Sequence, residues 1–361
     1  MTSKSAAPEE RKTPDDAEAM EALSAWRLSS PLLRPMVQGN INRSYLVEES
    51  TGHRSVLQWV SPIFEPSVCD DIDRVTAHLD RKGLVTPRLH RTLEGRCHAS
   101  QPSGTWRLMT FIPGRTFTRC AEPWQAKEAG RALGRFHMAL ADFDGPFTSR
   151  RAGVHDWTAH LAGLEAALGA HPAHPHRSLV APLADAILQE AGRCSEPVTT
   201  PERVVHGDPK IANLVFAADA PVAQAWIDLD TVAFMRLSLE MGDALRSWCQ
   251  AEVEDGPEAA AHFDLVRFEA ACRGYRASGM QPEPVEWASF ARATRLISLE
   301  LAARFCRDAF ETRYFGWDSS RFPDASTHHR IRAENQLALS RSVHAQLKEA
   351  DRVLSETFGG P

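Results

Sequence analysis

The sequence predicts an α+β fold in which a small β-rich lobe precedes a larger, mainly helical lobe. Two observations support this prediction. Residues 30–112 contain short apolar runs separated by glycine turns, whereas apolar residues recur at helical spacing over most of the chain after Trp124. The chain has 361 residues, of which 43% are hydrophobic, and this is enough apolar material for two lobes that share a cleft.

The small lobe is expected over residues 25–112, after an N-terminal tail over residues 1–24 that is polar at first and then helical in pattern. Glycine turns separate its strands, and one amphipathic pattern with a glycine at its end predicts a helix. The expected elements are a strand, turn and strand over 37–47, a strand over 55–60, a helix from 69 to about 83, and a β-rich run over 105–112 that ends before Pro113-Gly114.

The large lobe is expected over residues 113–361. Apolar residues lie on one face in several long segments, which predicts helices. A short turn that contains a proline separates two apolar runs, which predicts one β-hairpin. The expected order is helices near 124–143, 155–170 and 178–194, the hairpin over 213–230, and mostly helix from about 234 to the end.

The composition excludes several classes of protein. The net charge is −6 and no cluster of lysine and arginine is present, which argues against nucleic-acid binding. The seven cysteines contain no CxxC spacing, which argues against a zinc site or a disulfide framework. No apolar run reaches the ~20 residues of a membrane span, and the first 16 residues have no apolar core. We therefore expect a cytoplasmic protein, monomeric or dimeric, with no membrane or nucleic-acid partner.

The stretch VVHGDPKIANLVF (204–216) places an acid, a base and an amide in one loop. Asp208 and Asn213 have the order Asp-x-x-x-x-Asn, which protein kinases use for a proton-accepting carboxylate and a metal-binding amide. Lys210 can place positive charge on the transferred phosphoryl group, whose negative charge must be neutralised. We therefore predict that Asp208 and Lys210 are catalytic, that Asp208 also contacts the acceptor substrate, and that Asn213 is a magnesium ligand.

A second carboxylate for the metal follows the hairpin. The second apolar run ends in Ile-Asp-Leu-Asp at residues 227–230. A carboxylate at the end of an apolar strand is costly to bury unless it is paired or binds a metal. Asp228 is therefore predicted to be a magnesium ligand. Asp230 is expected on the substrate side, as a second ligand or as a group that orients the loop.

Each of these motifs has a simpler structural explanation. Asp208 could cap a turn, and an aspartate at a strand end is often structural. The joint pattern of HGDxKxxN, a hairpin and an apolar run ending in Asp-x-Asp favours kinase-like chemistry over coincidence. His206 is expected to orient the loop as a hydrogen-bond donor and not to catalyse. The acidic run EVEDGPE (252–258) is expected to be a solvated connection between helices.

From about Gln38 to Leu347 the chain resembles the aminoglycoside phosphotransferase and choline kinase superfamily, and within it the N-acetylhexosamine 1-kinase group. GNINRSYLV resembles its glycine turn, SVLQWV its third strand, WRLMTFIPG its hinge, HGDPKIANLVF its catalytic segment and WIDLDTV its metal segment. The resemblance implies a bilobal protein-kinase-like fold that binds ATP and Mg²⁺ and phosphorylates a small molecule.

The resemblance also implies residues for the nucleotide and the acceptor. ELAARFCRDAFETRYF (300–315) resembles a sugar-side segment, in which Arg304 and Tyr314 match residues that hold the sugar. From the residues alone, Arg304 could instead pair with Glu300 one helical turn earlier. The nucleotide residues implied are Gly39 and Asn40 in the glycine turn, Gln58 on the third strand, and the backbone of Thr110, Phe111 and Ile112 in the hinge.

The third strand departs from the protein-kinase pattern. Protein kinases place a lysine there to hold the α- and β-phosphates, and this chain has Gln58. Protein kinases pair that lysine with an acid on the small-lobe helix. In this chain the acid expected at that place is Asp70 or Asp71. Three functions therefore stay open. They are a kinase for the anomeric hydroxyl of a hexose or N-acetylhexosamine, a kinase for another small alcohol (aminoglycoside, choline, homoserine or thiosugar), and a nucleotide-binding pseudokinase.

Overall fold

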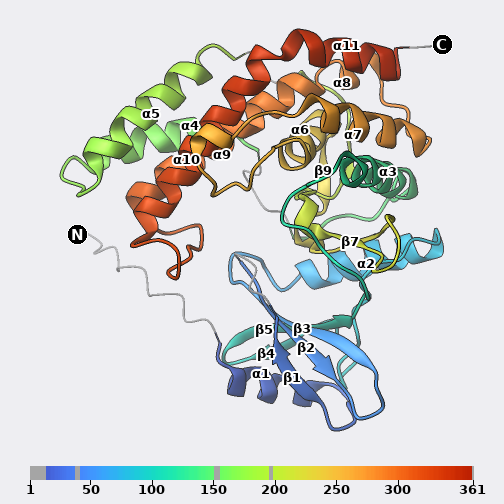
Figure 1. The fold of residues 1–361 in the computed structure, drawn as a ribbon. Helices are drawn as coiled ribbons and strands as arrows, with labels where there is room; N and C mark the ends of the chain where they lie inside the picture. Colours follow the sequence, from blue (N-terminus) through green and yellow to red (C-terminus); the bar gives the residue numbers. More distant parts are fainter. Residues whose placement is uncertain (1–13, 37–40, 150–154, 195–197, 360–361) are drawn as a thin grey trace. The chain divides into compact units, whose positions relative to one another are not determined.

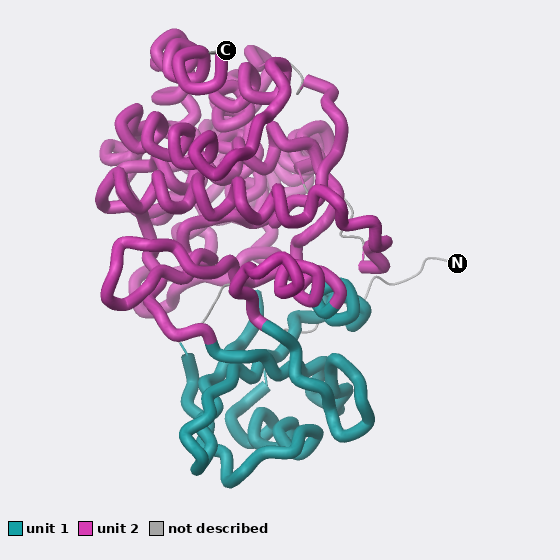
Figure 2. Tube along the Cα trace, turned by 90° about the vertical axis from the view of Figure 1, so that its right-hand side faces the viewer, with its two compact units in different colours: residues 1–73, 88–111 teal, residues 74–87, 112–361 magenta. Residues whose placement is uncertain are grey.

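The computed structural model describes residues 14–36, 41–149, 155–194 and 198–359. Its contacts divide the chain into two compact units, residues 1–73 with 88–111 and residues 74–87 with 112–361 (Figure 2). The first unit is built on an antiparallel sheet and the second is mainly helical (Figure 1). The predicted α+β class is therefore confirmed.

The first unit contains an antiparallel sheet in the order β1-β2-β3-β5-β4 (Figure 1). Its register is continuous across the three central strands, since Ser44 lies opposite Gln58 and Gln58 lies opposite Arg107. The strands are β1 (Leu32–Pro35), β2 (Arg43–Glu48), β3 (Arg54–Val60), β4 (Ala99–Gln101) and β5 (Gly104–Thr110).

One face of this sheet carries the hydrophobic core of the first unit. Tyr45, Leu57 and Trp106 are buried and point to this face, because side chains alternate along each strand. Helix α1 (Asp16–Ala22) and the 3₁₀ turn η1 (Leu23–Ala25) contribute apolar residues to the same core. Asp15 accepts the N–H groups of the first turn of α1, which satisfies donors that a helix start leaves open. The polar residues that alternate with these apolar residues along the strands therefore point to the opposite face of the sheet.

The second unit is organised around the long helix α9 (Phe290–Glu311). Its buried residues, among them Phe305 and Cys306, form one core with residues of three neighbouring helices. Helix α2 (Val68–Arg81) is shared by the two units. The other helices are α3 (Pro123–Ala139), α4 (Trp157–Ala170), α5 (Arg177–Ala191), α6 (Leu237–Trp248), α7 (Leu265–Ala277), α8 (Pro284–Trp287), α10 (Ala325–Ala345) and α11 (Leu347–Phe358), with a 3₁₀ turn η4 (Glu258–Ala260).

Two short antiparallel strand pairs hold the loops with the predicted chemistry. β7 (Leu214–Phe216) and β8 (Ala223–Trp226) form the predicted hairpin. β6 (Glu202–Val205) pairs with β9 (Ala233–Arg236), where the sequence pattern gave no strand. Because β6 and β9 are about thirty residues apart, their pairing depends on tertiary contacts that a local pattern does not encode. Two 3₁₀ turns lie between these strands. The turn η2 (Ile211–Asn213) leads into β7, and the turn η3 (Leu229–Thr231) lies between β8 and β9.

Across the described parts of the chain, no helix is both long and apolar enough to cross a membrane.

Candidate active site

The loop between β6 and β7 is held in one conformation by a glycine. Gly207 has φ +82°, and a Cβ atom there would lie 2.2 Å from the carbonyl oxygen of Thr231. Thr231 in turn donates its hydroxyl to the carbonyl oxygen of His206 at 3.0 Å. Only glycine combines this backbone conformation with so close an approach. The loop that carries Asp208 is thus packed directly against the segment that carries Asp228.

A buried carboxylate fixes the same loop from the other side. Both oxygens of Glu240 accept backbone N–H groups, from His206 and from Gly207, each at 2.9 Å. The Nε2 atom of His206 donates to the carbonyl oxygen of Ile227 at 3.0 Å, and its Nδ1 atom accepts the N–H of Asp208 at 3.3 Å. Burial lowers the pKa of His206, which keeps the ring neutral in this tautomer. His206 orients the loop, as the sequence predicts.

Three predicted residues meet at the carboxylate of Asp208. Lys210 Nζ donates to Asp208 Oδ2 at 2.5 Å, and Asn213 Nδ2 donates to the same oxygen at 3.1 Å and to the Asp208 carbonyl oxygen at 2.9 Å. Burial works against the charge of Asp208, but Lys210 outweighs it and lowers the pKa of Asp208. The side chains of Asp208 and Lys210 stay 30% and 40% exposed, so an acceptor can reach them.

The structure also brings Asp228 to this group. Its backbone is left-handed, with φ +62°, which is uncommon outside glycine and is typical of functional loops. Burial disfavours the charged amine of Lys210, but the carboxylates of Asp208 and then Asp228 outweigh it and raise the Lys210 pKa. Asp230 lies in the next turn of the chain, within η3, and is buried.

The orientation of the Asn213 amide is fixed by its hydrogen bonds to Asp208. Its nitrogen must face the Asp208 carbonyl oxygen, because that oxygen can only accept. The amide oxygen Oδ1 therefore points elsewhere and can coordinate a cation. An amide oxygen and a carboxylate such as that of Asp228 are the kinds of oxygen donor that Mg²⁺ prefers.

A charged network that the sequence did not indicate lies near Asp208. Arg246 donates to Asp243 at 2.9 Å and to Glu254 at 3.3 Å, and Arg332 donates to Glu254 at 3.0 Å. Asp243 also contributes to raising the pKa values of Lys210 and of His155, which faces Glu300 at 3.1 Å, so its charge acts on both groups.

Glu254 corrects one expectation from the sequence. Residues 252–258 were expected to be a solvated connection, yet Glu254 and Asp255 form ion pairs with Arg332 and Arg321 at 2.5 Å each. Both partners are more than sixty residues away in sequence, so an acidic run alone could not have indicated these contacts.

The structure brings together Arg304 and Tyr314, the two residues that the sequence predicts to hold the sugar. Arg304 Nη2 donates to the Tyr314 hydroxyl at 3.2 Å, and its guanidinium lies over the Tyr314 ring at 5.3 Å. Arg304 is also 3.7 Å from Glu300, so the pairing within the helix exists beside this contact. Asp308 accepts the backbone N–H groups of Arg313, Tyr314 and Phe315, which fixes the turn that follows α9.

In the first unit, Gln58 is held on both sides. Its Oε1 accepts from Arg107 and its Nε2 donates to Ser44 at 2.9 Å. Thr110 ends β5, and its N–H donates to the carbonyl oxygen of Arg88 at 2.9 Å. Of the two acids considered on α2, Asp70 is exposed and Asp71 is buried. Phe111 and Ile112 follow β5, and the predicted nucleotide residues Gly39 and Asn40 lie outside the described residues.

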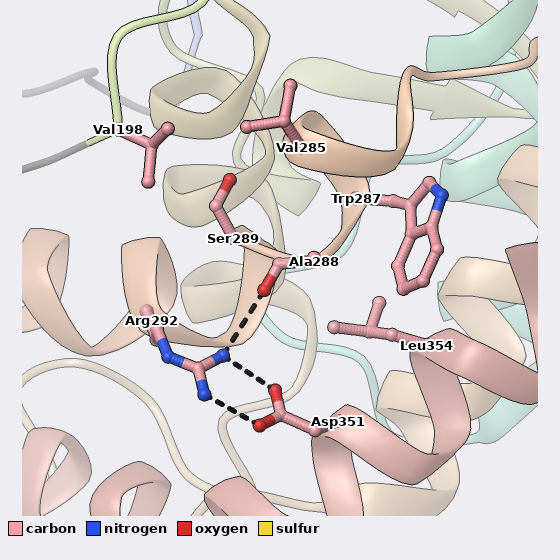
Figure 3. A pocket seen from close by; sticks show the side chains of 8 residues that line it. All are labelled: Val198, Val285, Trp287, Ala288, Ser289, Arg292, Asp351 and Leu354. Carbon is pink, nitrogen blue, oxygen red and sulfur yellow. Dashed lines mark hydrogen bonds and ion pairs between the residues drawn. The ribbon is translucent and has the colours of Figure 1, made fainter. Parts of the chain in front are cut away.

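Two cavities in the second unit lie away from these residues. One of about 430 Å³ is lined by apolar side chains of α8 and α11 and by the ion pair between Arg292 and Asp351 (Figure 3). The other, of about 600 Å³, lies between α3, β8 and the segment after α2. Neither contains a predicted catalytic, metal or substrate residue.

Comparison with known proteins agrees with this fold. Residues 33–279, more than half of the chain, match the phosphotransferase enzyme family, APH, and the chain belongs to that family. It is therefore a phosphotransferase that acts on hydroxyl groups of small molecules. This confirms the predicted enzyme class and superfamily.

Solved structures show the same fold at low sequence identity. An aminoglycoside phosphotransferase from Alicyclobacillus acidocaldarius is 17% identical, with TM-score 0.62 over 96% of this chain and 99% of that one. The amicoumacin kinase hAmiN, solved with AMP-PNP, Ca²⁺ and Ami, is 15% identical, with TM-score 0.59 over 90% and 94%. A choline kinase from Cryptosporidium parvum is 11% identical, with TM-score 0.57 over 96% and 99%.

Proposed function

We propose that this protein is an ATP- and Mg²⁺-dependent kinase that transfers the γ-phosphate to a sugar hydroxyl. The preferred acceptor in this proposal is the anomeric hydroxyl of a hexose or N-acetylhexosamine. The arrangement of Asp208, Lys210 and Asn213 around one carboxylate supports kinase chemistry. The AMP-PNP and Ca²⁺ bound to the amicoumacin kinase support a nucleotide and a divalent metal.

Each residue of the loop has a separate role in this proposal. Asp208 accepts the proton of the acceptor hydroxyl and aligns its oxygen with the phosphorus atom. Lys210 steadies the γ-phosphate, and Asn213 and Asp228 would hold Mg²⁺, which neutralises charge on the phosphates. The backbone of residues 110–112 would hold the adenine. Because the Thr110 N–H is used by Arg88, the donors available for adenine come from Phe111 and Ile112.

The observation that favours a neutral acceptor is the pairing of charges near Arg304. Among the described residues there, Glu300 faces His155 at 3.1 Å and Arg304 at 3.7 Å, and Asp243 and Glu254 face Arg246. A cationic amine would need a carboxylate that no protein cation already neutralises. A polyhydroxylated sugar needs donors, acceptors and apolar faces. The exposed rings of Tyr314 and Trp317 offer such faces.

A second candidate is a kinase for an amino alcohol. The names of the aminoglycoside phosphotransferase and the choline kinase of similar fold support it. One assay separates the two candidates. Purified protein with ATP and Mg²⁺ is incubated with hexoses, N-acetylhexosamines, aminoglycosides and choline, and the products are examined by ³¹P NMR. Coupling of the new phosphorus signal to an anomeric proton is the expected result. Phosphorylation of amines alone would reject the sugar acceptor.

An Asp208→Asn variant distinguishes an enzyme from a nucleotide-binding pseudokinase. Loss of the proton acceptor should reduce kcat by about 100-fold or more while ATP still binds. If the wild-type protein binds ATP but transfers no phosphate to any member of the panel, and this variant behaves identically, the pseudokinase explanation is favoured.

A further inference from the structure

Three polar side chains form a row across the first unit. Ser44 on β2, Gln58 on β3 and Arg107 on β5 lie directly opposite one another in the strand register. Directly paired residues share a face of an antiparallel sheet. The residues next to them along each strand, Tyr45, Leu57 and Trp106, point to the other face, which carries the hydrophobic core. The row therefore lies on the face that α1 does not cover.

The hydrogen bonds along this row have one possible direction. A guanidinium only donates, so Arg107 Nε and Nη2 must face the oxygen of the Gln58 amide, with Nε at 2.9 Å. The amide nitrogen then donates to Ser44 Oγ at 2.9 Å. Because that oxygen accepts, the hydroxyl proton of Ser44 must point to a third group. Among the described residues no hydrogen bond uses this proton.

Arg107 supplies a positive charge at one end of the row, and the Ser44 hydroxyl is an available donor at the other end. Arg107 is 1% exposed, so a ligand does not touch its guanidinium, but the guanidinium is always protonated. In a dry environment a charged donor polarises the bonds that follow it. The row links the Arg107 guanidinium through Gln58 to Ser44, which is half-buried.

This arrangement accounts for the missing lysine on β3. In protein kinases a lysine at this strand holds the α- and β-phosphates directly. Here the same strand has neutral Gln58, and the cation stands one strand further, on β5. We propose that the Ser44 hydroxyl donates to a phosphate oxygen of the nucleoside triphosphate and that Arg107, acting through Gln58, is a positioning residue for that contact. The inference rests on the proposed kinase function.

The test compares the affinities for ATP and for adenosine, which lacks phosphates. Both are measured by competition with a fluorescent ATP analogue in the presence of Mg²⁺. Ser44→Ala should weaken ATP binding about tenfold and leave adenosine binding unchanged, since a hydrogen bond to a charged group is lost. Ser44→Thr keeps the hydroxyl and should restore the ATP affinity. Gln58→Leu interrupts the row and should weaken ATP binding in the same selective way.

The chain offers a matched control on the same sheet face. Ser100 on the edge strand β4 is exposed and lies opposite Thr105, two residues before Arg107 on the same side of β5. Ser100→Ala should change neither affinity. If Ser44→Ala weakened ATP and adenosine binding equally, or weakened neither, the inference would be overturned while the proposed function would stand. If the wild-type protein binds no ATP, the proposed function fails, and the inference fails with it.

Discussion

Lys210 Nζ lies 2.5 Å from Asp208 Oδ2, across a single intervening proline. The carboxylate predicted to be catalytic and the cation predicted to steady the phosphate are thus paired with each other. Asn213 contacts the same carboxylate oxygen from the following 3₁₀ turn. The loop therefore holds the carboxylate in one orientation, and this orientation need not be acquired when the acceptor binds.

Lys210 should set the acid limb of the pH–rate profile. Burial would raise the pKa of Asp208, and Lys210 outweighs it and lowers that pKa. A base with a lowered pKa stays ionised to lower pH. In Lys210→Met, kcat should fall about 100-fold, and the acid limb of kcat/KM should move to higher pH. Profiles from pH 4.5 to 9 measure both effects. The exposed Lys127 allows a control, Lys127→Met, that should change neither.

Glu240 should matter for turnover beyond its effect on stability. In Glu240→Gln the amide has one accepting oxygen, so the N–H of His206 or of Gly207 loses its partner. The expected cost is ~1–3 kcal/mol of unfolding free energy, with a lower kcat. Glu286→Gln is the control, because Glu286 is equally buried and receives two donors from Arg203. It should lose stability in urea unfolding with little change in kcat. Equal kcat losses would contradict the loop-positioning role.

Gly207 should tolerate no side chain. Gly207→Ala combines a positive φ with a Cβ atom 2.2 Å from a backbone carbonyl oxygen, so the loop must move. Gly52 has a similar φ, +83°, with no atom within 4 Å of a Cβ. Gly52→Ala should therefore cost only the ~1–2 kcal/mol of the left-handed conformation. In thermal unfolding, the melting temperature of Gly207→Ala should lie well below that of Gly52→Ala. A smaller loss of stability in Gly207→Ala than in Gly52→Ala would show that the loop adapts.

Local patterns predicted most of the fold and the grouping of Asp208, Lys210 and Asn213 in one loop. The hairpin, the amphipathic helix α2 and the strands β3 and β5 have strong local signals, namely apolar periodicity and turn residues. The Asp208 group follows one motif, so residues that act together are also close in sequence. Similarly, Arg304 and Tyr314 lie ten residues apart on and just after one helix.

The residues that the sequence did not indicate depend on long-range contacts. Glu240 contacts His206 across 34 positions, and Arg332 contacts Glu254 across 78. Arg107 appeared only as one residue of an apolar strand, and the register of β3 and β5 places it beside Gln58. A single sequence does not state such pairings, because they follow from packing of separate elements and not from local periodicity.

Arg304 should act on the acceptor and not on the nucleotide. Its contact with the Tyr314 hydroxyl places a charged donor beside an exposed ring. Arg304→Met should raise KM for the acceptor about tenfold, the loss expected for one charged hydrogen bond, with KM for ATP unchanged. Arg307 on the same helix pairs with Glu311 at 3.1 Å and supplies the control, Arg307→Met. Equal effects of both variants on acceptor KM would remove Arg304 from the substrate site.

The stability of the fold near Arg304 should depend on pH. Burial lowers the pKa of His155, but Glu300 at 3.1 Å outweighs it and raises that pKa above 6.5. Burial would raise the pKa of Glu300, but His155, with Arg304 and His160, holds it below 4.5. Because the pKa of His155 is raised in the folded state, its ion pair stabilises the fold fully below pH 6.5. This stabilisation is lost as the pH rises through the pKa of His155 in the folded state. For Glu300, stabilisation is present above 4.5 and is lost as the pH falls through the folded value.

The ion pair should therefore stabilise the protein most between pH 4.5 and 6.5. The free energy of unfolding in urea should decrease from pH 6 to pH 8.5 in the wild type, and His155→Asn should decrease less over this range. Asparagine is chosen because His155 has φ +55°, which asparagine tolerates. The exposed His262 gives the control, His262→Asn, which should keep the wild-type slope. A variant at His155 with an unchanged slope would show that other groups titrate in this range.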